Sequence, residues 1–207
     1  MANDDVLRGV RTISQVAGSE LVPDLVRLLA AGQPVPVDRL AKATARPSSE
    51  VREELAKQPS VEWDDDGQIV GYGLTLRPTP HRFSFENKTL FGWCASDTLM
   101  FPLILDTEGV AESTCAATGR PIRVELYPHG VRRVDPPEAV VSEVRPQNGV
   151  VDVRAEVCGL GHFFSSREAA SEWLAAHPEG QVNSVEEDFV LHRSVIEELG
   201  WSATSGS

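Results

Sequence analysis

Two short segments carry the side chains best suited to chemistry. In the first, FGWCASDTLMFP at residues 91–102, Cys94 and Asp97 are three positions apart. A glycine before them and a proline after them predict a short helix over residues 94–100, with both side chains on one side. Cys94 then lies in the first helical turn, where the helix dipole favours a thiolate. A thiolate beside a carboxyl group can bind a soft metal ion and manage a proton.

The second segment is VCGLGHFF at residues 157–164. Cys158 ends a valine-rich stretch, residues 150–157, that predicts a strand, and two glycines follow in a turn that leaves the thiol accessible. Arg154 is four residues earlier, on the same face of that strand, where its charge favours a thiolate. Each residue also has an ordinary alternative, because free cysteines are often buried in cores and arginines are mostly exposed.

The cysteine count limits the class of protein. Three cysteines, at positions 94, 115 and 158, are an odd number without a CxxC pair, which argues against a disulfide scaffold and a zinc ribbon. The five histidines show no metal-binding spacing. The acidic start, MANDD, lacks the basic and apolar regions of a signal peptide, and no run of eighteen apolar residues occurs. We therefore expect free thiols in a cytoplasmic protein that has no membrane span.

Charge bears on the choice of partners. The formal net charge is −12, which repels phosphate backbones and anionic lipid, so neither nucleic acid nor a membrane is expected as a partner. The apolar fraction of 41% is sufficient for an ordinary hydrophobic core.

The N-terminal third has the element order of a winged-helix domain. Strands are expected on either side of a DDG turn, and Ser48 or Ser49 is placed to cap the fourth helix. The stiff sequence RPTP at residues 77–80 marks the domain boundary. The predicted helices cover residues 5–17, 19–31, 37–42 and 50–57, and the predicted strands cover residues 61–63 and 68–76.

The remainder predicts a mostly β domain that ends in two helices, each introduced by a capping box, Ser165 with Glu168 and Ser184 with Glu187. The fold class is therefore α+β. Residues 1–80 form a winged-helix-like helical domain with a β-hairpin, and residues 81–207 form a mainly antiparallel β catalytic domain with flanking helices. The predicted strands of this second domain are residues 81–85, 111–117, 121–126, 139–144 and 150–157.

Several segments together resemble one enzyme family, the organomercurial (alkylmercury) lyases. The resemblance extends from about residue 35 to about residue 200 with matching order and spacing. It rests on FGWC with DTLMFP around Cys94, CAATG at residues 115–119, Cys158 with HFF at residues 162–164, and GLTLRPTPH at residues 73–81. Some members of the family have a second cysteine where this sequence has Gly159. That extra thiol is not part of the core mechanism, so its absence puts in doubt only an auxiliary transfer of mercury.

The resemblance implies roles for particular residues. The two mercury-binding, catalytic cysteines fall on Cys94 and Cys158, the catalytic aspartate falls on Asp97, and a structural cysteine falls on Cys115. The implied reaction is protonolysis of a carbon–mercury bond to a hydrocarbon and Hg(II), as part of mercury detoxification. Thiolates suit mercury, and Asp97 is placed to carry the proton. We expect no organic cofactor, Hg(II) held as product by these three residues, small thiols as exchange ligands and a mercuric reductase as acceptor.

Two other functions fit parts of the pattern. A winged-helix regulator is disfavoured because residues 1–75 contain eight Lys or Arg against twelve Asp or Glu. A module that only binds a soft metal needs thiols but has no use for the carboxyl group of Asp97. Under the lyase interpretation, we expect the N-terminal domain to pack over the catalytic domain and shield the site from water.

Overall fold

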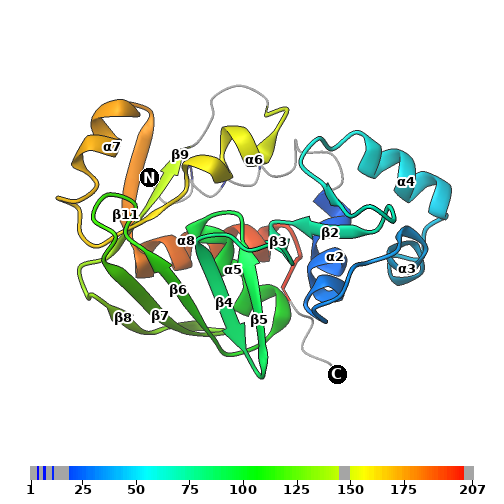
Figure 1. The fold of residues 1–207 in the computed structure, drawn as a ribbon, viewed down its shortest axis with the longest axis horizontal. Coiled ribbons are helices and arrows are strands. Elements are labelled where there is room, and N and C mark those ends of the chain that lie inside the picture. Colours follow the sequence, from blue (N-terminus) through cyan, green and yellow to red (C-terminus); the bar gives the residue numbers. More distant parts are fainter. Residues whose placement is uncertain (1–3, 5–6, 8–10, 12–18, 145–149, 203–207) are drawn as a thin grey trace.

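The structure is a computed structural model that describes residues 4, 7, 11, 19–144 and 150–202. It combines helices with two antiparallel sheets (Figure 1). The N-terminal helices gather at one end, and the large sheet with its covering helices forms the rest. The predicted α+β class is confirmed. None of the helices in the described ranges is long and apolar enough to cross a membrane.

The N-terminal helices pack through one apolar face. In α2, Leu25, Val26 and Leu29 are buried, and Gly32 follows with a positive φ of 77° that glycine adopts without steric cost. The helix predicted over residues 5–17 lies outside the described residues apart from two isolated positions, 7 and 11. The elements of this part are η1 (Ser19–Leu21), α2 (Val22–Leu29), α3 (Val37–Ala43) and α4 (Ser48–Ala56).

Two local predictions for this part are wrong. No serine side chain caps α4, which begins at Ser48 directly after Pro47, whose fixed φ of −60° leads the chain into the helix. The single strand predicted over residues 68–76 is two strands, because Gly73 adopts a positive φ of 71° between them. The strands concerned are β1 (Glu62–Trp63), β2 (Ile69–Tyr72) and β3 (Leu74–Thr75).

The N-terminal hairpin is continuous with the large sheet. β3 pairs with β5, with Leu74 opposite Gly92, so one eight-stranded sheet runs in the order β1-β2-β3-β5-β4-β6-β7-β8. The stretch predicted as the boundary, residues 77–80, therefore connects neighbouring parts of one sheet. The further strands are β4 (His81–Phe85), β5 (Lys88–Gly92), β6 (Gly109–Thr114), β7 (Pro121–Tyr127) and β8 (Gly130–Asp135).

Helix α5 (Ala95–Leu105) lies against this sheet and is almost entirely buried. We predicted that it would end near Pro102, but it continues through the proline and ends at Asp106, which is left-handed with a φ of 51°. An internal proline costs about 3 kcal/mol. Burial of Phe101 and Ile104, each worth about 1.5–3 kcal/mol, offsets that cost.

The strand predicted over residues 150–157 is not formed. Asp152 instead caps a short helix by accepting a hydrogen bond from the backbone N–H of Ala155, and the carboxylate of Glu156 accepts from the N–H of Val151. This local capping outweighs the β preference of the valines. The elements here are α6 (Val153–Glu156) and the 3-10 turn η2 (Cys158–Leu160).

A second, three-stranded sheet and two helices complete the chain. The capping box of Ser184 and Glu187 is confirmed, whereas the one at Ser165 is not formed, because that helix starts only at Ser171. Helix α8 packs along α5 on the covered side of the large sheet. The elements are β9 (Val140–Val144), β10 (Phe163–Phe164), α7 (Ser171–Ala176), β11 (Gly180–Ser184) and α8 (Val185–Glu198).

Candidate active site

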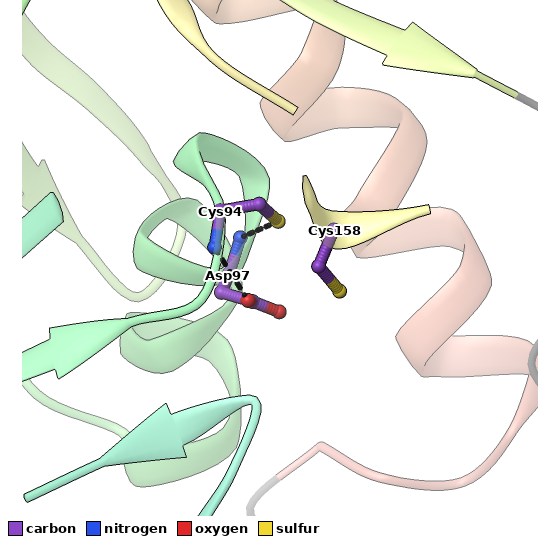
Figure 2. A group of neighbouring side chains, drawn as sticks. All are labelled: Cys94, Asp97 and Cys158. Atoms are coloured by element: carbon purple, nitrogen blue, oxygen red, sulfur yellow. Dashed lines mark hydrogen bonds between the residues drawn. The ribbon is translucent and has the colours of Figure 1, made fainter. Parts of the chain in front are cut away.

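Cys94 and Asp97 form a reciprocal cap at the start of α5. The thiol of Cys94 accepts a hydrogen bond from the backbone N–H of Asp97 at 3.4 Å, and the Asp97 carboxylate accepts from the N–H of Cys94 at 3.0 Å (Figure 2). Cys94 is thus the residue that caps the helix rather than a member of its first turn. The predicted spacing on one side is confirmed, and the cap fixes both side chains.

Cys158 reaches the same place from η2, sixty-four residues later in the chain. Figure 2 shows its thiol facing Cys94 and Asp97 across a gap, and the potential ligand atoms of the three side chains all lie within 4.8 Å of one another. Gly161 allows this approach. A Cβ at Gly161 would lie only 2.9 Å from the Cβ of Cys94. The backbone carbonyl of Gly161 accepts a hydrogen bond from the N–H of Ala95.

The site disfavours negative charge. The pKa of the Cys94 thiol is well above its usual value because of its hydrogen bond with Cys158, its burial and the neighbouring Asp97. The hydrogen bond with Cys94 lowers the pKa of Cys158, but burial and Asp97 outweigh it and raise that pKa. Burial also raises the pKa of Asp97, against the hydrogen bonds from Cys94. Our expectation of a resting thiolate at Cys94 is wrong, because burial and neighbours outweigh the helix dipole.

The three side chains open into a mostly apolar cavity of about 140 Å³. Two valines of α2, Val22 and Val26, line it together with Met100, Ile104 and Trp201. The N-terminal domain therefore packs over the site, as predicted. An apolar cavity of about 150 Å³ is large enough for a benzene ring.

The comparisons with known proteins point to one family. Residues 74–197 match the family model described as alkylmercury lyase, and residues 10–73 match the helix-turn-helix domain of alkylmercury lyase. An alkylmercury lyase of Staphylococcus epidermidis is 46% identical over 88% of this chain and 85% of that protein. One from Streptomyces lividans is 43% identical over 84% and 81%.

The chain belongs to the alkylmercury lyase family. The predicted resemblance is thereby confirmed, and the alternatives of a regulator and a passive metal-binding module are not supported. A solved structure, titled the mercury-bound form of MerB2, superimposes with a TM-score of 0.70 at 26% identity, covering 92% of this chain and 91% of that one. The two family models meet between residues 73 and 74, and our division at residue 80 stays a prediction.

In this member of the alkylmercury lyase family, Arg154 lies on helix α6 instead of on the predicted strand. Its guanidinium stacks over the ring of Trp93, 5.0 Å from the centroid, and donates a hydrogen bond to the carboxylate of Glu62. Trp93 lines the cavity. Glu62 was missed because a single acidic residue in a short strand gives no sequence signal.

A buried ion pair under the cavity was also missed. His192 lines the cavity and lies 3.2 Å from the buried carboxylate of Asp188, which accepts a hydrogen bond from the hydroxyl of Ser96. Burial lowers the pKa of His192, but the charge and hydrogen bond of Asp188 outweigh it and raise that pKa to about 9. Asp188 and His192 are four residues apart on one helix, and this spacing was the available sequence signal for the pair. Such Asp–His pairs are also common without a function.

Cys115 is separate from the cluster. It follows β6, is 1% exposed and packs in the core, in agreement with a structural role. From the sequence we expected no acidic or basic neighbour suited to activate this thiol. Burial raises its pKa, but hydrogen bonds with Thr118 and Ser165 outweigh this and lower the pKa to about 6.

Proposed function

We propose that this enzyme cleaves the carbon–mercury bond of small organomercurials by protonolysis at Cys94, Cys158 and Asp97. The observation that carries the proposal is the convergence of two buried thiols and one carboxyl group, with ligand atoms within 4.8 Å, at the base of an apolar cavity. Thiolates are preferred ligands of soft ions. A carboxyl group beside them supplies what a passive binding site lacks, a proton carrier.

The neutral resting state supplies the protons. Both thiols have raised pKa values, so each enters the reaction with its proton. Mercury releases that proton when it bonds to sulfur, because a coordinated thiol is deprotonated. For a substrate R–Hg–SR′ the overall change breaks the R–Hg bond, the Hg–SR′ bond and two S–H bonds of the enzyme, and it forms R–H, R′S–H and two new Hg–S bonds. One thiol proton leaves with the exchange ligand, and the other is available for the carbon.

Asp97 is placed to relay the second proton. Its pKa is raised by burial, so the carboxylate accepts a proton more readily than an exposed aspartate would. Its reciprocal hydrogen bonds with Cys94 hold it beside the sulfur that binds mercury. The second sulfur raises the coordination of mercury and pushes electron density toward carbon, which Asp97 protonates as the bond breaks. Hg(II) then stays on Cys94 and Cys158 with Asp97 close by.

The surroundings of the reaction follow from the same chemistry. We propose that no organic cofactor takes part, that small thiols deliver the substrate and remove Hg(II) by ligand exchange, and that a mercuric reductase accepts the product. A reducing cytoplasm suits this role, because it keeps three free thiols reduced. The acidic net charge of −12 favours neither nucleic acid nor a membrane as a partner.

The experiment is to add phenylmercury to the purified protein with excess small thiol and to measure benzene and bound mercury. We expect one benzene for each mercury processed. Cys158→Ser should leave one thiol, so phenylmercury is captured without cleavage, and mass spectrometry should detect the protein with the intact phenylmercury group.

Cys115→Ser is the matched control, since it makes the same substitution outside the cluster. It should lower thermal stability and leave activity per folded molecule nearly intact. If the parent protein binds mercury and releases no hydrocarbon, the proposed function is wrong.

A further inference from the structure

Glu62 is a buried carboxylate with four polar neighbours. Its side chain is 5% exposed, which is rare for a charged residue without partners. One oxygen accepts hydrogen bonds from Trp93 Nε1 at 2.8 Å and from Arg154. The other accepts from the hydroxyl of Thr75 at 2.7 Å and lies 4.0 Å from the guanidinium of Arg77. These charge-assisted bonds hold the surrounding side chains in one arrangement.

The neighbours of Glu62 belong to the segments that carry the two reactive thiols. Trp93 directly precedes Cys94. Arg154 lies four residues before Cys158, in the short helix α6 that leads into η2. Glu62 itself comes from β1, in the part that matches the helix-turn-helix family model. A single carboxylate therefore joins the N-terminal part to both segments of the site.

Ser60, two residues before Glu62, makes a second contact with α6. The hydroxyl of Ser60 donates to the carboxylate of Asp152 at 2.7 Å and accepts from the backbone N–H of Arg154 at 3.3 Å. Asp152 in turn caps α6. The position of α6 is thus set by Ser60 and Glu62, which lie just before β1 and within it.

We propose that Glu62 is a positioning residue that sets the spacing between the thiols of Cys94 and Cys158. It acts through Trp93 on one segment and through Arg154 on the other, and it does not touch the substrate. Arg154 also stacks over Trp93, so the two partners of Glu62 contact each other directly. The proposal rests on the proposed function, because it concerns the geometry that lets both sulfurs bind one mercury ion.

The consequence for the reaction is specific. Capture of R–Hg needs one thiol, whereas activation of the carbon needs both thiols at a fixed spacing. Misplacement of a reacting group by about 1 Å can cost about a hundredfold in rate. Loss of the Glu62 connection should therefore slow cleavage and leave capture nearly unchanged.

Glu62→Gln is the informative variant, because the amide keeps the shape and an acceptor for Trp93 but loses the charge that holds Arg154. We expect capture of phenylmercury at a parental rate, benzene release slowed by about tenfold to a hundredfold, and accumulation of the uncleaved adduct in single-turnover mass spectra. Glu54→Gln is the matched control. It breaks another partly buried ion pair of the N-terminal part, with Arg46, and should leave benzene release unchanged.

A double-mutant cycle separates positioning from general loss of stability. Arg154→Gln should slow cleavage to a similar degree, and the pair Glu62→Gln with Arg154→Gln should be little slower than either variant alone. Additive effects, or parental cleavage by Glu62→Gln, overturn the proposal. If Glu62→Gln does not fold, Arg154→Lys decides, since it keeps the charge but loses the planar fork. Parental cleavage by Arg154→Lys would then count against it.

Failure of the proposed function gives a different pattern. In that case the parent protein releases no benzene, and no variant changes a rate. Failure of the role of Glu62 alone leaves a parent that cleaves phenylmercury and a Glu62→Gln variant that cleaves it equally fast.

Discussion

At the scale of single residues, burial favours the neutral forms of the two thiols and the carboxyl group of the proposed site. The thiols of Cys94 and Cys158 and the carboxyl group of Asp97 all have raised pKa values because they are buried close together. A resting thiolate would be more nucleophilic, but it would also lack the proton that the carbon needs. In the proposed reaction, mercury binding itself drives the deprotonation.

Asp97→Asn tests the proton relay. The amide keeps the size of the side chain and cannot exchange a proton, so the variant should bind mercury and release hydrocarbon about a hundredfold to ten-thousandfold more slowly. Bound mercury and released benzene, measured on the same samples, check this. Equal rates for variant and parent would show that the proton reaches carbon by another path.

The buried pair of His192 and Asp188 predicts a pH dependence of stability. The folded-state pKa of His192 is about 9, above its usual value of 6.5. The pair's contribution to the free energy of unfolding is therefore complete below pH 6.5. It is lost as the pH rises through 9, because the folded protein then holds a proton that the unfolded chain has already released.

We expect the free energy of unfolding of the parent protein to fall between pH 6.5 and 9. His192→Gln should flatten that fall. Denaturant titrations across this range measure it, and an unchanged slope in the variant would contradict the assignment.

At the scale of elements, α2 and the segment that follows α8 form part of the wall of the cavity. Val22 and Val26 from α2 line the cavity with Ile104 of α5, and Trp201 lies beyond α8. Arg27 of α2 donates hydrogen bonds to the backbone carbonyls of Ile104 and Trp201, and it thereby links α2 to α5 and to the segment after α8. The wall is mostly apolar, so we expect it to select substrates by size rather than by polar contacts.

Val22→Phe should narrow the cavity and discriminate between substrates. The ratio kcat/KM for phenylmercury should fall by about tenfold or more, since apolar pockets discriminate by that order per group, while the value for methylmercury stays close to the parental one. Val190→Phe, on an exposed site of α8, is the control. An equal fall for both substrates would place the organic group elsewhere.

At the scale of the whole molecule, the part that matches the helix-turn-helix family model is built into the enzyme's fold. Its hairpin joins the large sheet, its helix α2 walls the cavity, and Glu62 connects it to both thiol segments. The second helix of the motif, α4, carries Glu50, Glu53 and Glu54 but one arginine, a composition that repels phosphate.

We therefore predict no useful binding to DNA. In fluorescence anisotropy with a random duplex at physiological salt, the Kd should be weaker than about 10⁻⁴ M, the weak end of non-specific binding. A salt-sensitive Kd in the micromolar range would show that the motif retains contact with nucleic acid.

The sequence by itself determined the features that depend on neighbouring residues. Cys94 and Asp97 are three residues apart, so a local helix start was enough to predict that they act together, and the capping box at Ser184 was equally local. The signals that define helices and turns lie within a few residues, and they predicted the α+β class and the hairpins β1–β2 and β6–β7.

Tertiary structure alone decided the features that depend on distant contacts. Burial turned the expected thiolate of Cys94 into a neutral thiol, and capping by Asp152 made a helix where the valines favour a strand. Glu62 and His192 acquire their roles only from partners that packing brings together, since the charge that a buried group holds depends on what surrounds it in space.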